Sequence, residues 1–333
     1  MNNKPVIGIL MGDAAGVGPE IIAKLVSKRF FDPYCRPIII GDMRIFERAC
    51  RTTNSNNTVN VIHSVEDIIW KDGIYPLFDQ NNLDPAEVPF GHLSTKSGLA
   101  CLNMLKLAVQ LSKDKIIDGF CFASLNKAAM KDAGCKFESE HHYMADLFGC
   151  TGPFGEINVV GNLWTTRSTS HIPIKDVSRE LTIEKILKAA RLCDTALKHS
   201  GISVPKIAMC ALNPHCGENG LCGREEIDII TPAIETAQKE GICASGPYPS
   251  DITFVKAFNG EFNGVVTMYH DQGQIALKLK GFDQGITIAG GMPVPIATCA
   301  HGTAYDIAGT GIVKTTAFEN AVKMVSKMAE HIQ

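Results

Sequence analysis

The chain has 333 residues, of which 45% are hydrophobic and 20% are charged, and its formal net charge is -3. A chain of this length exceeds the size at which a single hydrophobic core usually keeps growing, so we expect two domains. Scattered lysines and arginines in a slightly acidic chain argue against nucleic acid as the main partner, and no window approaches the ~20 apolar residues that span a bilayer, which argues against a membrane protein.

The N-terminus runs from Met1 directly into an apolar segment, without the charged and apolar regions of a signal peptide, so we expect a cytoplasmic protein. The 12 cysteines are dispersed and lie mostly in apolar segments. In a chain without an export signal, this pattern favours buried free thiols over disulfides. Cys216 and Cys222 flank a Gly-rich loop beside a histidine, so they remain alternative zinc ligands.

An apolar strand pattern at residues 6–10 opens the chain, followed by a Gly-rich turn at 12–20 and an amphipathic helix at 21–30. Pro19 suits the first turn of that helix, so the three elements together are typical of an α/β protein. The glycine spacing matches a dinucleotide fingerprint poorly and the Walker lysine is absent. A structural turn is therefore favoured over a phosphate cradle.

Strand-like and helix-like segments alternate along the rest of the chain. Their alternation predicts a mostly parallel sheet with helices on its faces. The polar residues 268–273 are expected to form a turn after a strand. Strand patterns occur at residues 37–42, 59–63, 119–123, 157–160, 207–212 and 264–268, and helical patterns at 43–50, 97–113, 128–132, 144–148, 176–199, 227–240 and 316–331.

Three histidines, His171, His215 and His270, follow apolar segments of this kind. Ligands in open α/β sheets bind at the carboxyl ends of the strands, so these positions suit a functional site. Neutral imidazoles are common zinc ligands, and three of them leave a coordination position open for a substrate. Because dispersed ligands carry no spacing signature, a structural hydrogen-bonded pair of His270 and Asp271 remains the alternative.

Other ionisable residues lie near predicted strand or helix ends. Lys127 follows the strand pattern at 119–123 and is a candidate anion binder. His141 and His142 are adjacent on a predicted helix and point in different directions, so they are not expected to share a metal, although one could contact a substrate. Two roles are open for Lys278. It is either an ordinary charged surface residue or a functional residue whose ammonium group binds an oxyanion.

Seven stretches resemble, in the same order, the 4-hydroxythreonine-4-phosphate dehydrogenase family of vitamin B6 synthesis. Taken together, their NPH, YHDQG and HGTAxDIAGxG motifs are specific, and they cover nearly the whole chain, which we interpret as a diverged member. The stretches are GDAAGVGPE at 12–20, SLNKAAMKDAG at 124–134, TSHIP at 169–173, NPHCGENG with GREE at 213–226, SDITF at 250–254, MYHDQG at 268–273 and HGTAYDIAGTG at 301–311.

The resemblance implies an α/β fold like that of isocitrate and isopropylmalate dehydrogenases, with two α/β/α domains and an interdomain cleft. It implies a nucleotide-binding domain at residues 1–125 and 280–333, and a domain for metal, substrate and dimerisation at 126–279. It also implies a homodimer with its site at the subunit interface, a divalent metal ion (zinc, magnesium, manganese or cobalt), and NAD, with NADP as an alternative.

The resemblance also implies roles for particular residues. His171, His215 and His270 match the family's metal ligands. Lys278 matches a lysine that would stabilise developing negative charge, and Asp251 matches a carboxylate that would act as a base. The loop that begins at His301 resembles an adenosine-binding loop, in which an aspartate accepts hydrogen bonds from the ribose and so favours NAD. Its expected cofactor contacts are His301, Gly302, Thr303, Ala304 and Asp306.

The chain departs from the family where the family holds its substrate. The usual His-Thr turn is replaced, and either Glu140 or His141 can be aligned with the family's histidine. An Asn and an Arg of the family correspond to Thr287 and Ile296, and an apolar side chain cannot replace a bidentate phosphate binder. The expected substrate contacts are His141, His142, Lys127, Thr287 and Arg167, with Arg167 or Lys127 as the partner of a carboxylate.

These features predict an NAD-dependent and metal-dependent dehydrogenase that oxidises a secondary alcohol of a small hydroxy acid. An unphosphorylated substrate is favoured, such as a 2- or 3-hydroxy acid or a cis-dihydrodiol carboxylate. Whether decarboxylation follows is left open. The alternative substrates are 4-phosphohydroxy-L-threonine and 4-phospho-threonate. The alternative of another class is a non-catalytic ligand-binding descendant, and the retained histidines, Lys278 and Asp306 argue against it.

Overall fold

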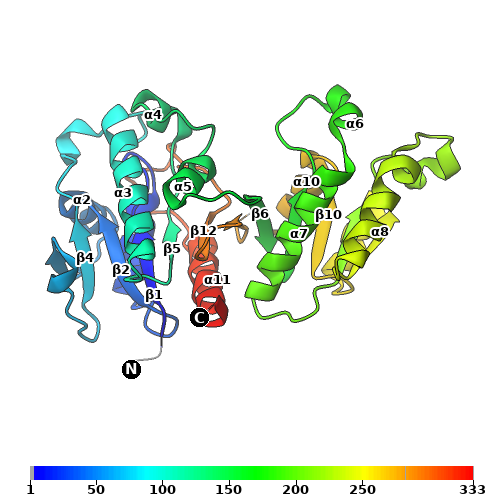
Figure 1. Cartoon of the computed structure of the whole chain (residues 1–333). Helices are drawn as coiled ribbons and strands as arrows, with labels where there is room; N and C mark the ends of the chain where they lie inside the picture. The colour runs from blue at the N-terminus through cyan, green and yellow to red at the C-terminus, as the bar shows by residue number, and fades with distance from the viewer. Residues whose placement is uncertain (1–3, 282, 333) are drawn as a thin grey trace. The chain divides into compact units, whose positions relative to one another are not determined.

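The computed structural model describes residues 4–281 and 283–332. The chain divides into two compact units, unit 1 with Met1–Thr151 and Ile286–Gln333, and unit 2 with Gly152–Gly285 (Figure 1). Each unit has a mostly parallel sheet with helices packed on it, so the predicted α/β fold is confirmed. The division falls after Thr151 and Gly285, later than the boundaries expected after residues 125 and 279. No helix in the described residues has the length and apolar character needed to cross a membrane.

The sheet of unit 1 has the strand order β3-β4-β2-β1-β5-β12-β11, in which only β11 runs antiparallel to its neighbour. The pairing aligns Leu10 of β1 and Thr298 of β12 with Phe122 of β5, so these three strands end at one edge. The strands are β1 (Val6–Leu10), β2 (Arg36–Gly41), β3 (Val59–Ile62), β4 (Tyr75–Asp79), β5 (Gly119–Phe122), β11 (Ile286–Gly290) and β12 (Ile296–Cys299).

Three helices of unit 1, at residues 43–52, 95–113 and 127–132, begin after residues whose side chains cap the free amides. Asp42 accepts a hydrogen bond from the Arg44 amide, Ser94 from Ser97 and Asn126 from Ala129, as expected for N-cap side chains. Helix α3 packs on β1 and β2, and α11 on β5, β11 and β12 (Figure 1). The helices are α1 (Gly18–Ser27), α2 (Met43–Thr52), α3 (Thr95–Lys113), α4 (Lys127–Asp132), α5 (Glu140–Phe148) and α11 (Thr316–Ile332).

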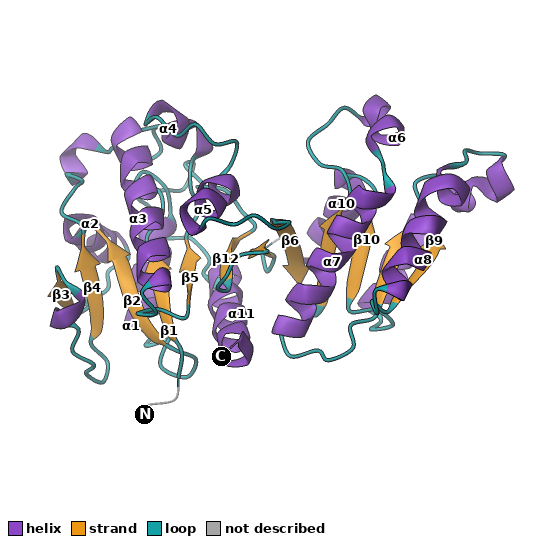
Figure 2. Cartoon of the chain, in the orientation of Figure 1, coloured by secondary structure: helices purple, strands orange, loops and turns teal. Residues whose placement is uncertain are grey.

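The sheet of unit 2 has the strand order β6-β7-β10-β8-β9, in which β6 is antiparallel to β7 and the other pairs are parallel. Helix α7 packs on β7, β10 and β8, while α10 packs on β6, β7 and β10 (Figure 2). The strands are β6 (Gly155–Val160), β7 (Leu163–Arg167), β8 (Ile207–Cys210), β9 (Ala244–Tyr248) and β10 (Gly264–Thr267), and the helices α6 (Val177–Glu180), α7 (Ile183–His199), α8 (Thr231–Lys239), α9 (Ser250–Phe258) and α10 (His270–Gly281).

A buried apolar cluster in unit 2 fixes the positions of α9 and α10. Phe254 of α9 and Leu277 of α10 pack with Ala208 and Cys210 of β8 and Val265 of β10. Because each helix begins only a few residues before its buried anchor, this packing also fixes the start of each helix at the edge of the sheet. Burying side chains of this size contributes about 1.5–3 kcal/mol each.

The structure corrects the sequence prediction in several local elements. The residues 268–273 were expected to form a turn, but α10 begins at His270 and includes Asp271 and Gly273. The packing of Leu277 outweighs the turn-forming tendency of these residues. The sequence analysis also left out the strands β4, β7, β9, β11 and β12, which are short and lie next to prolines, glycines or polar residues.

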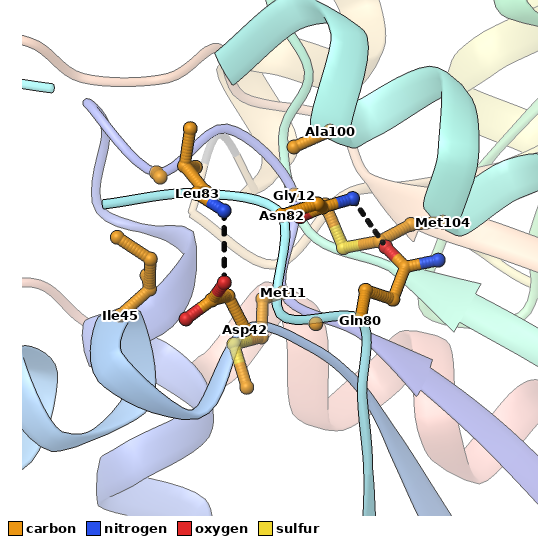
Figure 3. A pocket seen from close by; sticks show the side chains of 11 residues that line it. Met11, Gly12, Asp42, Ile45, Gln80, Asn82, Leu83, Ala100 and Met104 are labelled. Atoms are coloured by element: carbon orange, nitrogen blue, oxygen red, sulfur yellow. Dashed lines mark hydrogen bonds between the residues drawn. The ribbon is translucent and has the colours of Figure 1, made fainter. Parts of the chain in front are cut away.

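A small cavity in unit 1 lies beside the ends of β1, β2 and β4 (Figure 3). Its lining includes Met11, Asp42, Leu83 and Met104, and the Leu83 amide donates a 2.9 Å hydrogen bond to Asp42 Oδ2. The cavity volume is about 10 Å³. A space of this size holds at most about one water molecule, so we exclude it as a substrate site.

Candidate active site

The three histidines expected to bind a metal follow three neighbouring parallel strands of unit 2. His171 lies after β7, His270 after β10 and His215 after β8, and β10 lies between the other two. The pairing aligns Thr267 with Arg167, so β7 and β10 end side by side. The ring centroids of His171 and His270 are 5.5 Å apart. The fold therefore places all three imidazoles at one edge of the sheet and brings two of them together.

A pocket of about 220 Å³ opens beside His171 and His270. Its volume suits a ligand smaller than a typical drug molecule. The left-handed backbone of His171, with φ of 38°, turns the chain sharply at the pocket. The lining residues are Thr169, Ser170, His171, Ile172, Ile174, Val177, Tyr269, His270 and Asp271.

Hydrogen bonds to the end of β10 hold the His171 loop. The Ser168 amide donates to Thr267 O at 2.8 Å, and the Thr169 amide donates to Met268 O at 3.2 Å. The Thr169 hydroxyl donates a second hydrogen bond to Met268 O at 2.7 Å. These hydrogen bonds extend the pairing of β7 and β10 beyond the ends of the two strands. The segments that lead to His171 and His270 are therefore held next to each other.

The side chain of Arg167 also holds the His171 loop in place, through a hydrogen bond to Ser170. Its Nε donates to Ser170 Oγ at 2.8 Å, its Nη1 donates to Asn158 Oδ1 at 2.7 Å, and its Nη2 pairs with Glu156. The side chain is only 10% exposed. Each of the three guanidinium nitrogens of Arg167 thus has a hydrogen-bond partner within unit 2. Its expected role as the partner of a substrate carboxylate stays a prediction.

Asp271 orients the imidazole of His270. The His270 Nδ1 and the Asp271 Oδ1 are 2.6 Å apart. A carboxylate at Nδ1 favours the tautomer in which Nε2 carries the lone pair, and this is the arrangement that second-shell carboxylates give to metal-binding histidines. The predicted alternative, a His-Asp pair, is therefore present, and it leaves one imidazole nitrogen free to act as a ligand.

Gln272 connects the ends of three elements. The Met268 amide donates to its Oε1 at 2.7 Å, and its Nε2 donates to Ala211 O at 2.8 Å and to Ser250 Oγ at 2.9 Å. The turn that carries His270 is thereby tied to the end of β8 and the start of α9. The sequence analysis did not identify this role, although Gln272 lies within the MYHDQG stretch.

The segment that leads to His215 is held by a buried carboxylate. It lies in the short 3-10 segment Pro214–Gly220, with a left-handed backbone at φ of 51°. The Leu212 and Asn213 amides donate to Glu226 Oε1 at 2.8 and 2.7 Å, and Asn213 Nδ2 donates to Glu226 Oε2 at 2.9 Å. Glu226 is 3% exposed. The sequence analysis assigned no role to this residue, so its part in positioning the histidine loop was missed.

The three histidines do not form one compact cluster of donor atoms within the described residues. Within the described residues, the ring nitrogens of His171, His215 and His270 do not all come within 4.8 Å of one another. The chemistry of the donor set nevertheless fits a divalent ion of the zinc type, because all three donors are imidazoles and one is already oriented by a carboxylate.

The two expected catalytic residues of unit 2 lie in different places. Asp251 is exposed in the first turn of α9, which follows β9 and therefore begins at the same edge as the histidines. Lys278 is exposed on α10, eight residues after His270. Eight residues of helix rise by about 12 Å, so the backbones of His270 and Lys278 lie about two helical turns apart.

The loop expected to bind the nucleotide leaves β12 and lies against the Gly-rich turn after β1. The Val17 amide donates to Thr303 O at 3.1 Å, and Ser124 Oγ, after β5, donates to His301 O at 2.9 Å. A Cβ at Gly16 would lie 2.7 Å from Thr303 O, so the close approach requires a glycine. The loop therefore occupies the edge at which β1, β5 and β12 all end.

Tyr305 fastens the middle of this loop. Its hydroxyl donates to Asp13 Oδ2 at 2.5 Å and accepts from Asn126 Nδ2 at 2.9 Å. Burial, together with the hydrogen bond to Asp13, raises the pKa of Tyr305. The phenol consequently stays protonated at neutral pH and remains a donor to the carboxylate.

A second buried carboxylate, Glu20, fastens the end of the loop. Its Oε1 accepts a 2.6 Å hydrogen bond from the Gly309 amide and its Oε2 a 2.9 Å bond from the Gly311 amide. Glu20 is fully buried in the first turn of α1. Asp306 lies between Tyr305 and Gly309, the two positions where the loop is held by hydrogen bonds. Asp306 is exposed, so its carboxylate is accessible to a ligand. No local pattern in the sequence indicated the role of Glu20.

The expected substrate residues of unit 1 fall into two groups. Lys127 begins α4 and its Nζ lies 3.6 Å from Glu140 Oε2, while the buried His141 has its Nδ1 3.6 Å from Glu140 Oε1. His142 is exposed and contacts Ser139 Oγ at 2.9 Å. Thr287 lies apart from these residues, in β11. Both residues that could replace the family's histidine, Glu140 and His141, are thus buried side by side.

Comparisons with known proteins show that the sequence of this chain is similar to one protein family and to several of its named members. The model of the family described as pyridoxal phosphate biosynthetic protein PdxA matches residues 33–325. A provisionally named 4-hydroxythreonine-4-phosphate dehydrogenase 2 of Pseudomonas aeruginosa is 40% identical over 332 residues, which are 98% of each protein. A provisionally named D-threonate 4-phosphate dehydrogenase of Halalkalibacterium halodurans is 37% identical over 333 residues, which are 99% of each protein.

Solved structures show the same similarity in three dimensions. The 4-hydroxythreonine-4-phosphate dehydrogenase of Klebsiella pneumoniae matches with a TM-score of 0.86 and 29% identity, covering 98% of this chain and 99% of that one. The corresponding structure from Burkholderia phymatum gives a TM-score of 0.84 and 35% identity, with the same coverage. The similarity therefore includes both strand edges described above.

Proposed function

This chain belongs to the family of the pyridoxal phosphate biosynthetic protein PdxA and is a dehydrogenase of that type, and we propose that it uses NAD and a divalent metal ion to oxidise the secondary alcohol of a small hydroxy acid. The observation that carries the proposal is the placement of His171, His215 and His270 after three adjacent parallel strands. A structural protein has no need for three imidazoles at one strand edge.

His171, His215 and His270 would hold the metal ion, which is zinc, magnesium, manganese or cobalt. A bound ion would supply Lewis-acid chemistry that lowers the pKa of the substrate alcohol, and a bound nicotinamide would take up the hydride. Asp271 keeps the Nε2 of His270 available as a donor. Asp251, at the same strand edge, is the proposed base for the alcohol proton.

The loop at residues 301–311 is the proposed binding site for the adenosine part of NAD. Support comes from its two fastened points, Tyr305 and the amides bound by Glu20, which pre-shape the backbone before a nucleotide binds. The exposed Asp306 would accept hydrogen bonds from the ribose hydroxyls. A 2′-phosphate would be repelled there, so NAD is preferred over NADP.

We propose a homodimer in which Lys278 reaches the substrate of a second copy. Lys278 lies about 12 Å along α10 from His270, and its side chain is exposed at the helix surface. Helix α10 also exposes Ile275 and Leu279, at 59% and 84% exposure, on either side of Lys278 in the sequence. An apolar helix face of this kind is typical of a protein interface.

Two kinds of substrate are considered, which differ in whether the hydroxy acid carries a phosphate group. An unphosphorylated hydroxy acid is favoured by Ile296, which is fully buried in β12 and so cannot contact a phosphate. A 4-phosphate ester, such as 4-hydroxythreonine 4-phosphate or D-threonate 4-phosphate, is favoured by the printed names of the relatives. We keep the unphosphorylated acid as the first candidate because its support lies in this chain.

The test is NADH formation, followed by absorbance, with purified protein supplied with zinc, magnesium, manganese or cobalt. Phosphorylated hydroxythreonine and threonate are compared with their unphosphorylated forms and with dihydrodiol carboxylates. Turnover only without phosphate supports the first candidate, and turnover only with phosphate establishes the second. If neither occurs and neither NADH nor metal binds, the chain is a non-catalytic descendant.

A further inference from the structure

The pocket beside His171 and His270 has one wall that the proposed metal site does not explain. Its lining includes the apolar side chains of Ile172, Ile174 and Val177, which we call the apolar wall. Ile174 is 72% exposed and Ile172 is 37% exposed, while Val177 is 4% exposed and anchors the segment. Ligand pockets typically combine an apolar lining with a few polar groups, and this pocket joins an apolar wall to two imidazoles.

The segment that carries the apolar wall is fixed at both ends. It begins in the loop after β7, and Ser178 of α6 donates a hydrogen bond to Glu225. The other carboxylate oxygen of Glu225 accepts a 2.7 Å hydrogen bond from Asn213 Nδ2, in the loop after β8. Because β10 lies between β7 and β8, the segment crosses the strand edge at which His270 begins α10, and α6 lies beyond the strand ends in Figure 1. The apolar wall therefore has a defined position beside the histidines before any ligand binds.

The charges of this pocket suit an alkyl group better than a phosphate group. Within the described residues, its lining contains neither lysine nor arginine, and Asp271 adds a carboxylate. A phosphate group is usually held by guanidinium or ammonium groups. Against the apolar wall it would lose its hydration without gaining such partners, which is costly for a charged group. An alkyl group would instead cover the exposed side chain of Ile174 and remove it from water.

We propose that the substrate of this site carries an aliphatic group, of about the size of an isobutyl group, that binds against the apolar wall. The hydroxyl and carboxylate oxygens of the substrate then face His171 and His270. Ile174 is the main specificity-determining residue, because its side chain has the largest exposed fraction in the wall. The direction of the oxygens rests on the proposed function, whereas the contact between the alkyl group and the isoleucines does not.

The first test measures binding rather than turnover, through the visible spectrum of the cobalt-loaded protein. Lactate and 2-hydroxyisocaproate differ only in the size of the alkyl group. The larger acid should bind at least about tenfold more tightly, because each buried methylene is worth about fourfold in affinity. In Ile174→Thr this advantage should shrink at least about threefold, while Ile69→Thr, at a similarly exposed isoleucine of unit 1, should keep it. Equal affinities for the two acids in the wild type, an unchanged advantage in Ile174→Thr, or tighter binding of D-threonate 4-phosphate would overturn the proposal.

The second test needs neither metal nor turnover, so it separates this inference from the proposed function. In protein with labelled isoleucine methyl groups, 2-hydroxyisocaproate should shift the NMR signals of Ile172 and Ile174, assigned from Ile172→Val and Ile174→Thr, and leave those of Ile69 in place. Such shifts without metal binding or turnover would mean that the proposed function fails and the apolar subsite stands. Metal binding and turnover without shifts at either isoleucine would leave the proposed function intact and sink this inference.

Discussion

The two units form their strand-edge sites from different chemical groups. In unit 1 the loop after β12 is shaped by Asp13 and Glu20, buried carboxylates that accept hydrogen bonds from Tyr305 and from backbone amides. In unit 2 the loops present imidazole side chains, and Glu226 and Gln272 hold the backbone behind them. Single substitutions of loop side chains should therefore have larger effects on ligand binding in unit 2 than in unit 1.

The largest effect is expected for His270→Ala, which removes a proposed ligand. Because losing a partner outside the ligand set already costs about 10–100-fold in metal affinity, losing a ligand should cost more than about 100-fold. Calorimetric titration with zinc, and with cobalt for its visible spectrum, measures the change. His63→Ala, at an exposed histidine of unit 1, is the matched control. Unchanged affinity in His270→Ala would remove the metal centre from this edge.

Glu226→Leu should produce the next largest effect, on stability as well as on the histidine loop. The change leaves the Leu212 and Asn213 amides without their acceptor, although Asn213 Nδ2 keeps its bond to Glu225 Oε2, and we expect a loss of about 2–4 kcal/mol in the free energy of unfolding. Urea unfolding measures it, and Glu235→Leu, on an exposed position of α8, serves as the control. A loss no larger than in the control would mean that Glu226 does not hold the His215 loop.

These supporting residues show where the sequence stopped being informative. The histidines were found because polar groups follow apolar runs and match family motifs, and the α/β class was found from the alternation of elements. The spatial order β7-β10-β8 could not be read, because strand pairing depends on contacts between distant segments. For the same reason the supporting roles of Glu20 and Glu226 could not be recognised, because the amides that they bind lie in separate loops.

Local patterns also misled where packing decides the conformation. The residues from His270 onward resemble a turn because Asp271 and Gly273 favour turns, yet the burial of Leu277 makes them the first turn of α10. The strands β11 and β12 are short and separated by Gly and Pro residues, so periodicity could not reveal them. The metal and nucleotide roles of the site residues remain predictions for the experiments described here.

Asp271→Asn tests the orientation of His270 more finely than removal of the ring. The amide keeps the size of the side chain but weakens the acceptor at His270 Nδ1, so metal affinity should fall by about 10–100-fold. The same zinc titration measures it, and Asp228→Asn, at an exposed helical position, is the control. An affinity equal to that of the wild type would show that His270 is oriented by its backbone alone.

Tyr305→Phe should give the smallest effect, and it tests whether unit 1 depends on one side chain as little as its structure indicates. The substitution removes one hydroxyl, but Asp13 keeps its hydrogen bonds from the Ala15 amide and Ser97 Oγ, and Glu20 still fastens Gly309 and Gly311. We therefore expect a loss of only about 1 kcal/mol, equivalent to about fivefold weaker NADH binding. Fluorescence titration measures it, with Tyr34→Phe as the matched control. A loss as large as that in Asp271→Asn would mean that the two edges depend equally on single side chains, and the contrast between the units would not hold.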